Sequence, residues 1–219
     1  MGADQTKLSR DQWAWEFLRR NPLYQTDYQQ FIAIWHALEA NYGAPPNRDF
    51  QRWKRDARAY GPLPGSSAGD QPDTASGDRC VGEDERIFLE CWMGAKWGFN
   101  KFPLDPHRSL PPPPEELSWR TPPARHAHDI DEAYRLDIAF DLSLPLLPQL
   151  DAAKFRLASR VAELRRAGHA APHSVTHQRD YWTQLIGALD TPASAPETLL
   201  AAAQKMAESG YREILRLAG

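Results

Sequence analysis

Near the start of the chain, apolar residues recur every three or four positions, which is the period of an α-helix. In the run from Leu23 to Asn41 the steps between large side chains alternate between four and three, so these side chains fall on one face. This face comprises Tyr24, Tyr28, Phe31, Trp35, Leu38 and Tyr42. A shorter helix is expected before it, from Arg10 to Arg20, with Ser9 as its N-cap. Asn21-Pro22 separates the two, because the residue before a proline is biased away from helix.

The rest of the chain predicts further helices and one strand. Helical periods mark 49–60, 84–96, 147–167, 174–189 and 196–217. Residues 134–142 alternate between apolar and polar side chains, which is the period of a strand. We therefore expect a mainly α protein with a small β component. Its expected parts are a helical N-terminal domain, a long linker, and a helical C-terminal part with one or two short strands.

The helical pattern is interrupted at 61–85, a stretch rich in Gly, Pro, Ser and Asp. It has almost no large apolar side chains and cannot offset its chain entropy by burial, so we expect a flexible linker. A second proline-rich stretch includes Pro111 to Pro114, for which polyproline II geometry and the role of a stiff connector are expected. The expected domains are a helical segment (1–60), the linker (61–85), a mixed helix and extended segment with the proline-rich connector (86–144), and a C-terminal helical domain (145–219).

The charge balance excludes a polycation that coats nucleic acid through bulk charge. The 219 residues hold 26 basic and 29 acidic side chains, a net charge of −3. The balance is uneven, because residues 1–60 hold 9 basic and 7 acidic side chains whereas residues 61–131 hold 7 and 12. With two cysteines and no signal-peptide pattern, we do not expect a secreted disulfide scaffold. No apolar run approaches the roughly 18 residues of a membrane span, so we expect a cytoplasmic protein without membrane contact.

Motifs of catalysis or metal binding are not found in the sequence. It has no Gly-rich phosphate loop, no nucleophile elbow and no His-Glu-x-x-His helix. Cys80 and Cys91 would need histidines from elsewhere to form a zinc site. The spacing of His169, His173 and His177 suits one helix face, but a proline interrupts it. We therefore expect that the protein is not an enzyme and holds no metal or cofactor.

Basic side chains are more informative than any catalytic motif. Four of them lie within a span of seven residues in the helix expected at 49–60, where Trp53 stands among them. A fifth comes just before this helix, and two more end the first helix. Lys and Arg fix a protein on phosphates, and aromatic neighbours can set its register. The candidate DNA-binding residues are Arg19, Arg20, Arg48, Arg52, Lys54, Arg55 and Arg58. The alternative is an ordinary solvated helix face.

Three segments resemble a known family. Trp13 to Tyr24, with the sequence WAWEFLRRNPLY, resembles the opening of the transcriptional-regulator-like domain of proteobacteria. Two further landmarks of that family follow in order, KWGFNKFPLDP at 96–106 and FDLSLPLLPQL at 140–150. Proteins with this domain often belong to integrative conjugative elements and plasmids. The resemblance implies a bacterial, DNA-binding regulator of transcription on a mobile genetic element.

The C-terminal part resembles, incompletely, the helix-turn-helix domain of related activators of mobile-element excision. Residues 185–190 resemble its first helix and residues 206–215 its last, with only 191–205 between them. Of these intervening residues, Gln204 and Lys205 are the ones suited to base edges. Two functions stay open: a DNA-binding transcriptional regulator, and a protein-interaction module (an antiactivator or adaptor) with little DNA binding of its own. The expected partners are DNA and either a protein partner or a second copy in a homodimer.

Overall fold

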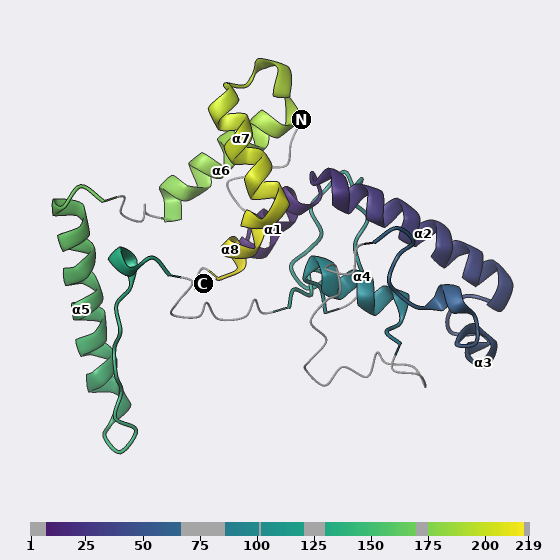
Figure 1. Ribbon diagram of the computed structural model, residues 1–219, viewed down its shortest axis with the longest axis horizontal. Coiled ribbons are helices and arrows are strands. Elements are labelled where there is room, and N and C mark those ends of the chain that lie inside the picture. The colour runs from purple at the N-terminus through teal and green to yellow at the C-terminus, as the bar shows by residue number, and fades with distance from the viewer. Residues whose placement is uncertain (1–7, 67–85, 101, 121–129, 170–174, 217–219) are drawn as a thin grey trace. The chain divides into compact units, whose positions relative to one another are not determined.

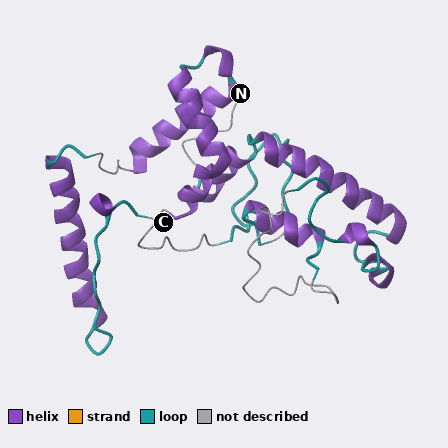
Figure 2. Ribbon diagram, viewed as in Figure 1, coloured by secondary structure: helices purple, strands orange, loops and turns teal. Residues whose placement is uncertain are grey.

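The computed structural model describes residues 8–66, 86–100, 102–120, 130–169 and 175–216 (Figure 1). The chain divides into unit 1, residues 1–122 with 181–219, and unit 2, residues 123–180. The described residues are mostly helical, as expected, and form isolated β-bridges but no strand (Figure 2). The expected β component is therefore not confirmed. The domain boundaries at 60, 85 and 144 stay predictions.

The first two helices form where the apolar period predicts them, as α1 (Arg10–Leu18) and α2 (Pro22–Tyr42). Ser9 begins α1 with a capping box, in which the Gln12 N–H donates to Ser9 Oγ (3.2 Å) and the Ser9 N–H donates to Gln12 Oε1 (2.9 Å). Gly43 ends α2 with a φ of 83°, a value that costs glycine little because it has no Cβ.

Asn21 forms the turn between these helices and joins it to a distant segment. Its Oδ1 accepts the N–H groups of Leu23 (2.8 Å) and Tyr24 (3.2 Å), which caps α2. Its Nδ2 donates to the carbonyl oxygen of Ala207 (3.1 Å), and the Asn21 side chain is only 2% exposed. Ala207 lies in the π-helical turn Met206–Gly210. One side chain thus closes the α1–α2 turn and holds a segment near the C-terminus.

The larger of two apolar clusters in unit 1 joins segments from both sides of residues 67–85, and the smaller one consists of Leu38, Trp53, Ala59 and Tyr60. α1 and α2 contribute to the larger cluster, the core, together with α4 (Leu89–Trp97), α6 (Val175–Asp190), α7 (Glu197–Lys205) and α8 (Tyr211–Arg216). Aromatic rings dominate this core, and its members include Trp13, Trp15, Phe17, Tyr24, Phe31, Trp92, Phe99 and Tyr211. Contacts such as that of Trp13 with Trp182, whose ring centroids are 5.5 Å apart, join α1 to α6. The sequence on both sides of the expected linker therefore builds this core.

The helix expected over 49–60 does not form as one element. α3 covers only Phe50–Trp53, and a separate 3-10 turn covers Ala57–Ala59. Asp49 caps the first through the N–H three residues on, and Asp56 caps the second through the N–H two residues on. The backbone of Asp56 is extended, with φ −81° and ψ 124°. The helical prediction is wrong here because an aspartate side chain competes for backbone N–H groups and favours caps over helix interiors.

Two expected connectors pack against the body of unit 1 in their described parts. Residues 61–66 include Leu63, which is 1% exposed and belongs to the core. Residues 67–85, the remainder of the expected linker, lie outside the described residues. The proline-rich stretch lies against the start of α1, where Gln12 Nε2 donates to the carbonyl oxygen of Pro112 (3.0 Å).

α4 begins later than the sequence predicts. The sequence predicts a start at residue 84, but Phe88 has extended backbone (φ −58°, ψ 144°) and forms a β-bridge with Tyr60, so the helix begins at Leu89. The ring of Phe88 also stacks on that of Tyr60, with centroids 5.0 Å apart. Pairing with a distant segment overrides the helical period at these positions.

In its described residues, unit 2 contains α5 (Leu146–Arg166), the segment that precedes it and the start of α6. The strand expected over 134–142 does not form, because its residues lie beside α5 and have no partner strand among the described residues (Figure 1). Arg160 Nη2 donates to the carbonyl oxygen of Ala133 (3.0 Å) and ties the two together. An alternating pattern shows an apolar face but not what covers it. Here Leu136 and Ile138 are half-buried, whereas Phe140 and Leu142 are exposed.

The last predicted helix forms as a nearly continuous helical run. It comprises α7, the π-helical turn Met206–Gly210 and α8. α6 covers the range predicted at 174–189 to within one residue at each end. These helices match the apolar periods that predicted them.

Replacing Asn21 should show how far unit 1 depends on this side chain. Asn21→Ala should lower the free energy of unfolding by about 2–3 kcal/mol, because α2 loses its N-cap and the Ala207 carbonyl loses its donor. Asn21→Ser keeps a capping oxygen but cannot reach Ala207, so its loss should be about half as large. Urea unfolding followed by circular dichroism measures both. Unchanged stability in both variants would contradict the role of Asn21.

Candidate nucleic-acid interface

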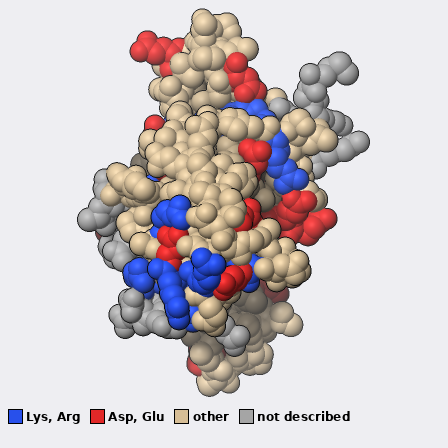
Figure 3. All heavy atoms as spheres, turned by 90° about the vertical axis from the view of Figure 1, so that its right-hand side faces the viewer, with Lys and Arg blue, Asp and Glu red and all other residues tan. Residues whose placement is uncertain are grey.

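The basic residues predicted to contact DNA lie in two separate places. Arg19 and Arg20 follow α1, whereas the other candidates, Arg48, Arg52, Lys54, Arg55 and Arg58, lie after α2 on and around α3. Figure 3 looks onto the side of the molecule where α3 lies in Figure 1 and shows Lys and Arg side chains gathered there, with acidic side chains among them. The structure therefore does not bring all the candidates together.

Arg19 and Arg20 are engaged by carboxylates within unit 1. Arg20 Nη1 lies 2.6 Å from Glu16 Oε2, and its Nε lies 2.7 Å from Asp190 Oδ1. Arg19 Nε also bonds Glu16 Oε2 (3.0 Å). Desolvation acts to lower the pKa of Arg20, but the hydrogen bonds to Asp190 and Glu16 outweigh it and raise this pKa. With only 14% of its side chain exposed, Arg20 mainly joins α1 to the end of α6.

Arg48 is held between aromatic rings. Its Cζ lies 3.6 Å from the ring centroid of Trp53 and 4.6 Å from that of Trp35. Its Nη2 lies 3.5 Å from Glu39 Oε1, and 11% of the Arg48 side chain is exposed. A guanidinium over an indole face is attracted by the ring quadrupole, and more strongly when water is excluded. Arg48 therefore fastens α3 to the C-terminal part of α2.

The neighbouring basic side chains are more accessible. Arg52, Arg55 and Arg58 are exposed, and Lys54 is half-buried. Arg52 Cζ lies 5.6 Å from the ring centroid of Tyr42 on α2. We call Arg52, Lys54, Arg55 and Arg58 the basic segment. It begins in the four-residue helix α3 and continues through a turn into the 3-10 turn Ala57–Ala59. It therefore cannot fill a major groove as a recognition helix does, but it can approach phosphates.

Asp56 is a member of this site that the sequence reasoning missed. Arg58 Nη2 lies 2.6 Å from Asp56 Oδ2, and the hydroxyl of Tyr42 donates to the same oxygen (2.9 Å). The hydrogen bond from Arg58 holds the pKa of Asp56 well below its usual range. Since 47% of the Arg58 side chain is exposed, this guanidinium is accessible but partly neutralised. The spacing of two residues between Asp56 and Arg58 is the feature of the sequence that could have indicated this ion pair.

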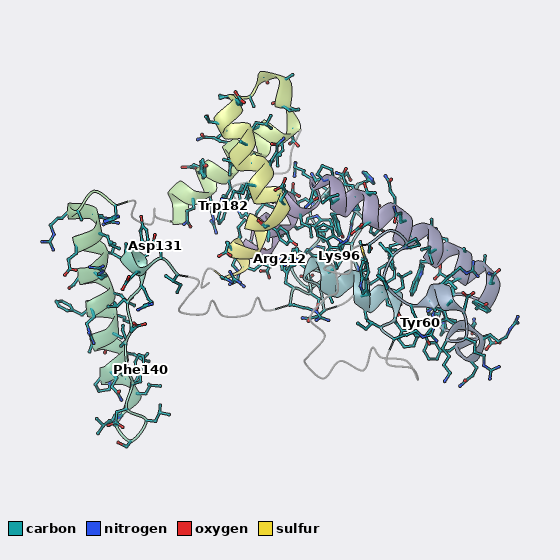
Figure 4. The ribbon with its side chains drawn as sticks, in the orientation of Figure 1. Tyr60, Lys96, Asp131, Phe140, Trp182 and Arg212 are labelled. Carbon is teal, nitrogen blue, oxygen red and sulfur yellow. The ribbon has the colours of Figure 1, made fainter. Side chains whose placement is uncertain are left out.

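The last helix, α8, packs on the segment around α4 within unit 1. The Tyr211 hydroxyl donates to the carbonyl oxygen of Trp97 (3.2 Å), and Arg212 Nη2 donates to that of Lys96 (2.7 Å). Figure 4 labels Arg212 and Lys96 where these segments meet. Gln204 and Lys205, the residues suited to base edges, are exposed at the end of α7.

The described part of the chain has neither a cluster of metal-ligating side chains nor a helix that could span a membrane. No group of three His, Cys, Asp or Glu side chains there could hold a metal ion. Cys91 is disulfide-bonded, so its sulfur is not available as a thiolate ligand. Cys80 and His173 lie outside the described residues. None of the helices in this part combines the length and apolar character that crossing a bilayer requires.

The segment that carries the family resemblance is used in folding. Trp15 and Tyr24 are fully buried, and their ring centroids are 6.0 Å apart. The Tyr24 hydroxyl donates to the carbonyl oxygen of Leu104 (2.5 Å), and burial raises the pKa of Tyr24 well above its ordinary value. Leu104 belongs to the second landmark, 96–106, and Phe99 of that landmark also packs on Trp15. The first two landmarks therefore form one packed unit.

Comparison with known proteins supports the regulator family over the N-terminal part of the chain. Residues 3–53 match the model of the proteobacterial transcriptional regulator-like domain. The matched residues include α1, α2 and α3 and end at Trp53, on which Arg48 stacks. No curated protein and no solved structure matches the chain. The match indicates a regulatory role.

Variants of Arg48 test whether aromatic stacking holds α3 in place. Arg48→Ala should lower the free energy of unfolding by about 2 kcal/mol, because the desolvated cation–π contacts are lost. Arg48→Lys keeps the charge but not the planar group, so it should recover less than about half of that loss. Urea unfolding followed by tryptophan fluorescence measures both. A lysine variant as stable as the wild-type chain would show that stacking contributes nothing.

Proposed function

We propose that the protein is a DNA-binding transcriptional regulator that contacts DNA phosphates through its basic segment. The observation that carries the proposal is the exposure of Arg52, Arg55 and Arg58 where the match to the regulator-like domain ends. Arg48 holds this part of the chain on α2 through Trp35 and Trp53. Such a surface presents positive charge on a rigid base, which lowers the entropy lost when the side chains bind phosphate.

The charge distribution supports this location. Residues 61–131 hold 12 acidic and 7 basic side chains, so the overall net charge of −3 does not describe the surface near α3. Local positive charge is sufficient for phosphate binding, whose strength follows the number of phosphates neutralised. A regulator of this kind needs no catalytic residue and no cofactor.

The same proposal places the regulator on a mobile genetic element in the bacterial cytoplasm. Its support is the likeness of residues 13–24 and 96–106 to a domain common in conjugative elements and plasmids. Integrase, relaxase or excision genes beside the gene would agree with this setting. A chromosomal neighbourhood without such genes in every strain that carries it would contradict the setting.

Removing the three exposed arginines should weaken DNA binding and its dependence on salt. Each phosphate contact contributes about 0.9 to the slope of log K against log salt concentration. The Arg52→Ala, Arg55→Ala, Arg58→Ala triple variant should therefore lose up to about 3 units of slope and bind at least about tenfold more weakly. Electrophoretic shifts of the protein's own upstream DNA, over a series of salt concentrations, measure both.

A matched variant separates this site from general electrostatics. Arg10→Ala, Lys154→Ala and Arg156→Ala together remove the same charge from residues outside the basic segment. This control should keep most of the slope and affinity. If both triple variants lose binding equally, or if the first still binds normally, the basic segment is not the contact surface.

Neutralising Asp56 should strengthen DNA binding. Asp56→Asn keeps a side-chain oxygen for the Arg58 N–H but removes the charge that pairs with the Arg58 guanidinium. The freed guanidinium should add about 1 unit to the salt slope and tighten binding several-fold. The same shift assay measures this gain. Asp137→Asn serves as the control, because Asp137 is an exposed aspartate outside the basic segment. Weaker binding by Asp56→Asn would contradict the proposal.

The second candidate is a protein-interaction module, an antiactivator or adaptor. The observation that favours it is a group of exposed apolar side chains before and at the start of α5, in which Leu142 is 91% and Leu147 is 75% exposed. Exposed apolar groups of this kind often mark protein interaction sites. On this reading DNA binding is weak at physiological salt, and a partner regulator co-purifies with the wild-type chain but not with a Leu142→Ser, Leu147→Ser variant.

A further inference from the structure

Two opposite faces of α5 have different surroundings. The face toward the preceding segment holds Ala153 and Leu164, which are both 6% exposed, and Arg160, which bonds the carbonyl oxygen of Ala133. The opposite face is exposed along the whole helix and has nothing packed on it among the described residues of unit 2. This outer face comprises Asp151, Phe155, Ala158, Ala162 and Arg165.

The outer face has the spacing of a helix-pairing surface. Its members are separated by steps of four, three, four and three, the 3.5-residue repeat that keeps one line of side chains against a partner helix. Phe155, the large apolar residue between Asp151 and Arg165 on this face, is 76% exposed, and Leu147, four residues before Asp151, is 75% exposed. Ala158 and Ala162 follow Phe155 with small side chains. A large side chain beside two small ones fits a second copy of the same surface, because the large group of one copy can occupy the space over the small groups of the other.

The charges at the two ends of this face determine the direction of pairing. Asp151 lies near the N-terminal end of α5, and Arg165 and Arg166 lie at its C-terminal end. A parallel pair would place like charges side by side, whereas an antiparallel pair brings each carboxylate to the arginines of the other copy. The present partner of Asp151 is Lys154 at 3.3 Å, with both side chains more than 75% exposed. Such an exposed ion pair is worth little and does not prevent a new one.

We infer that a second copy of this chain docks antiparallel on the outer face of α5. The two-fold axis passes near Ala158, so Phe155 of each copy packs over Ala158 and Ala162 of the other, and Asp151 lies level with Arg165 of the other. Both copies use the same surface, as a closed two-fold dimer requires. The inference specifies a homodimer in unit 2 and does not depend on DNA contact by unit 1.

Sedimentation of the full chain over micromolar concentrations tests the dimer. The wild-type chain should dimerise, and Phe155→Glu should raise the dissociation constant at least about a hundredfold, because two buried aromatic anchors are lost per dimer. Leu23→Glu is the matched control: Leu23 is 67% exposed on α2, and its replacement should leave the dissociation constant unchanged. Circular dichroism checks that helicity is retained. A monomeric wild-type chain, or a Phe155→Glu variant that dimerises normally, overturns the inference.

Charge reversal and cross-linking test the direction of pairing. Asp151→Arg alone should weaken the dimer about tenfold, and adding Arg165→Asp and Arg166→Asp should restore it, because the charges have then only changed places. Ala158→Cys should form a disulfide between copies under mild oxidation. Asp151→Cys should not, because the two positions are about 21 Å apart along an antiparallel pair. Efficient cross-linking through position 151, or no restoration by the triple variant, overturns the antiparallel arrangement.

Discussion

The side chain of Asn21 makes three hydrogen bonds in a place that water does not reach. Two of them cap α2, and the third holds the carbonyl oxygen of Ala207. The ion pairs of Arg20 with Glu16 and Asp190 lie at the same junction and join α1 to α6. The turn between the first two helices is therefore also the place where the C-terminal helices attach, and the shared aromatic core follows from this attachment.

This arrangement separates the part of the chain that identifies the family from the part that is accessible to a ligand. Trp15 and Tyr24 of the matched region are buried, and Tyr24 bonds the second landmark through Leu104. Among the candidate DNA-binding residues, the accessible ones come after Arg48, which stacks on Trp53 at the end of the matched region. The first landmark therefore indicates a scaffold, and the basic segment that follows supplies the surface on which a regulatory role can act.

Local signals in the sequence predicted the elements that depend on local interactions. Apolar period, caps and stops placed α1, α2 and α5, because Ser9, Asn21, Gly43 and Gly168 act within a few residues. The prediction of one helix over 49–60 is wrong. An aspartate is compatible with an exposed helix surface, but Asp56 caps the next turn instead and so interrupts the helix. The prediction of a strand over 134–142 failed because alternation shows an apolar face but not what covers it. Contacts such as Arg20 with Asp190 have no local signal in the sequence, so the intramolecular contacts of Arg19, Arg20 and Arg48 could not be predicted from it.

Amide hydrogen exchange of the full chain, with and without its own upstream DNA, tests the central claim most directly. The account predicts slower exchange at residues 50–58 when DNA is present, and no change over α5 or over the buried turn at Asn21. Protection confined to α5 or to the C-terminal helices, with residues 50–58 unchanged, would contradict it. This measurement locates the contact on the chain without altering any residue.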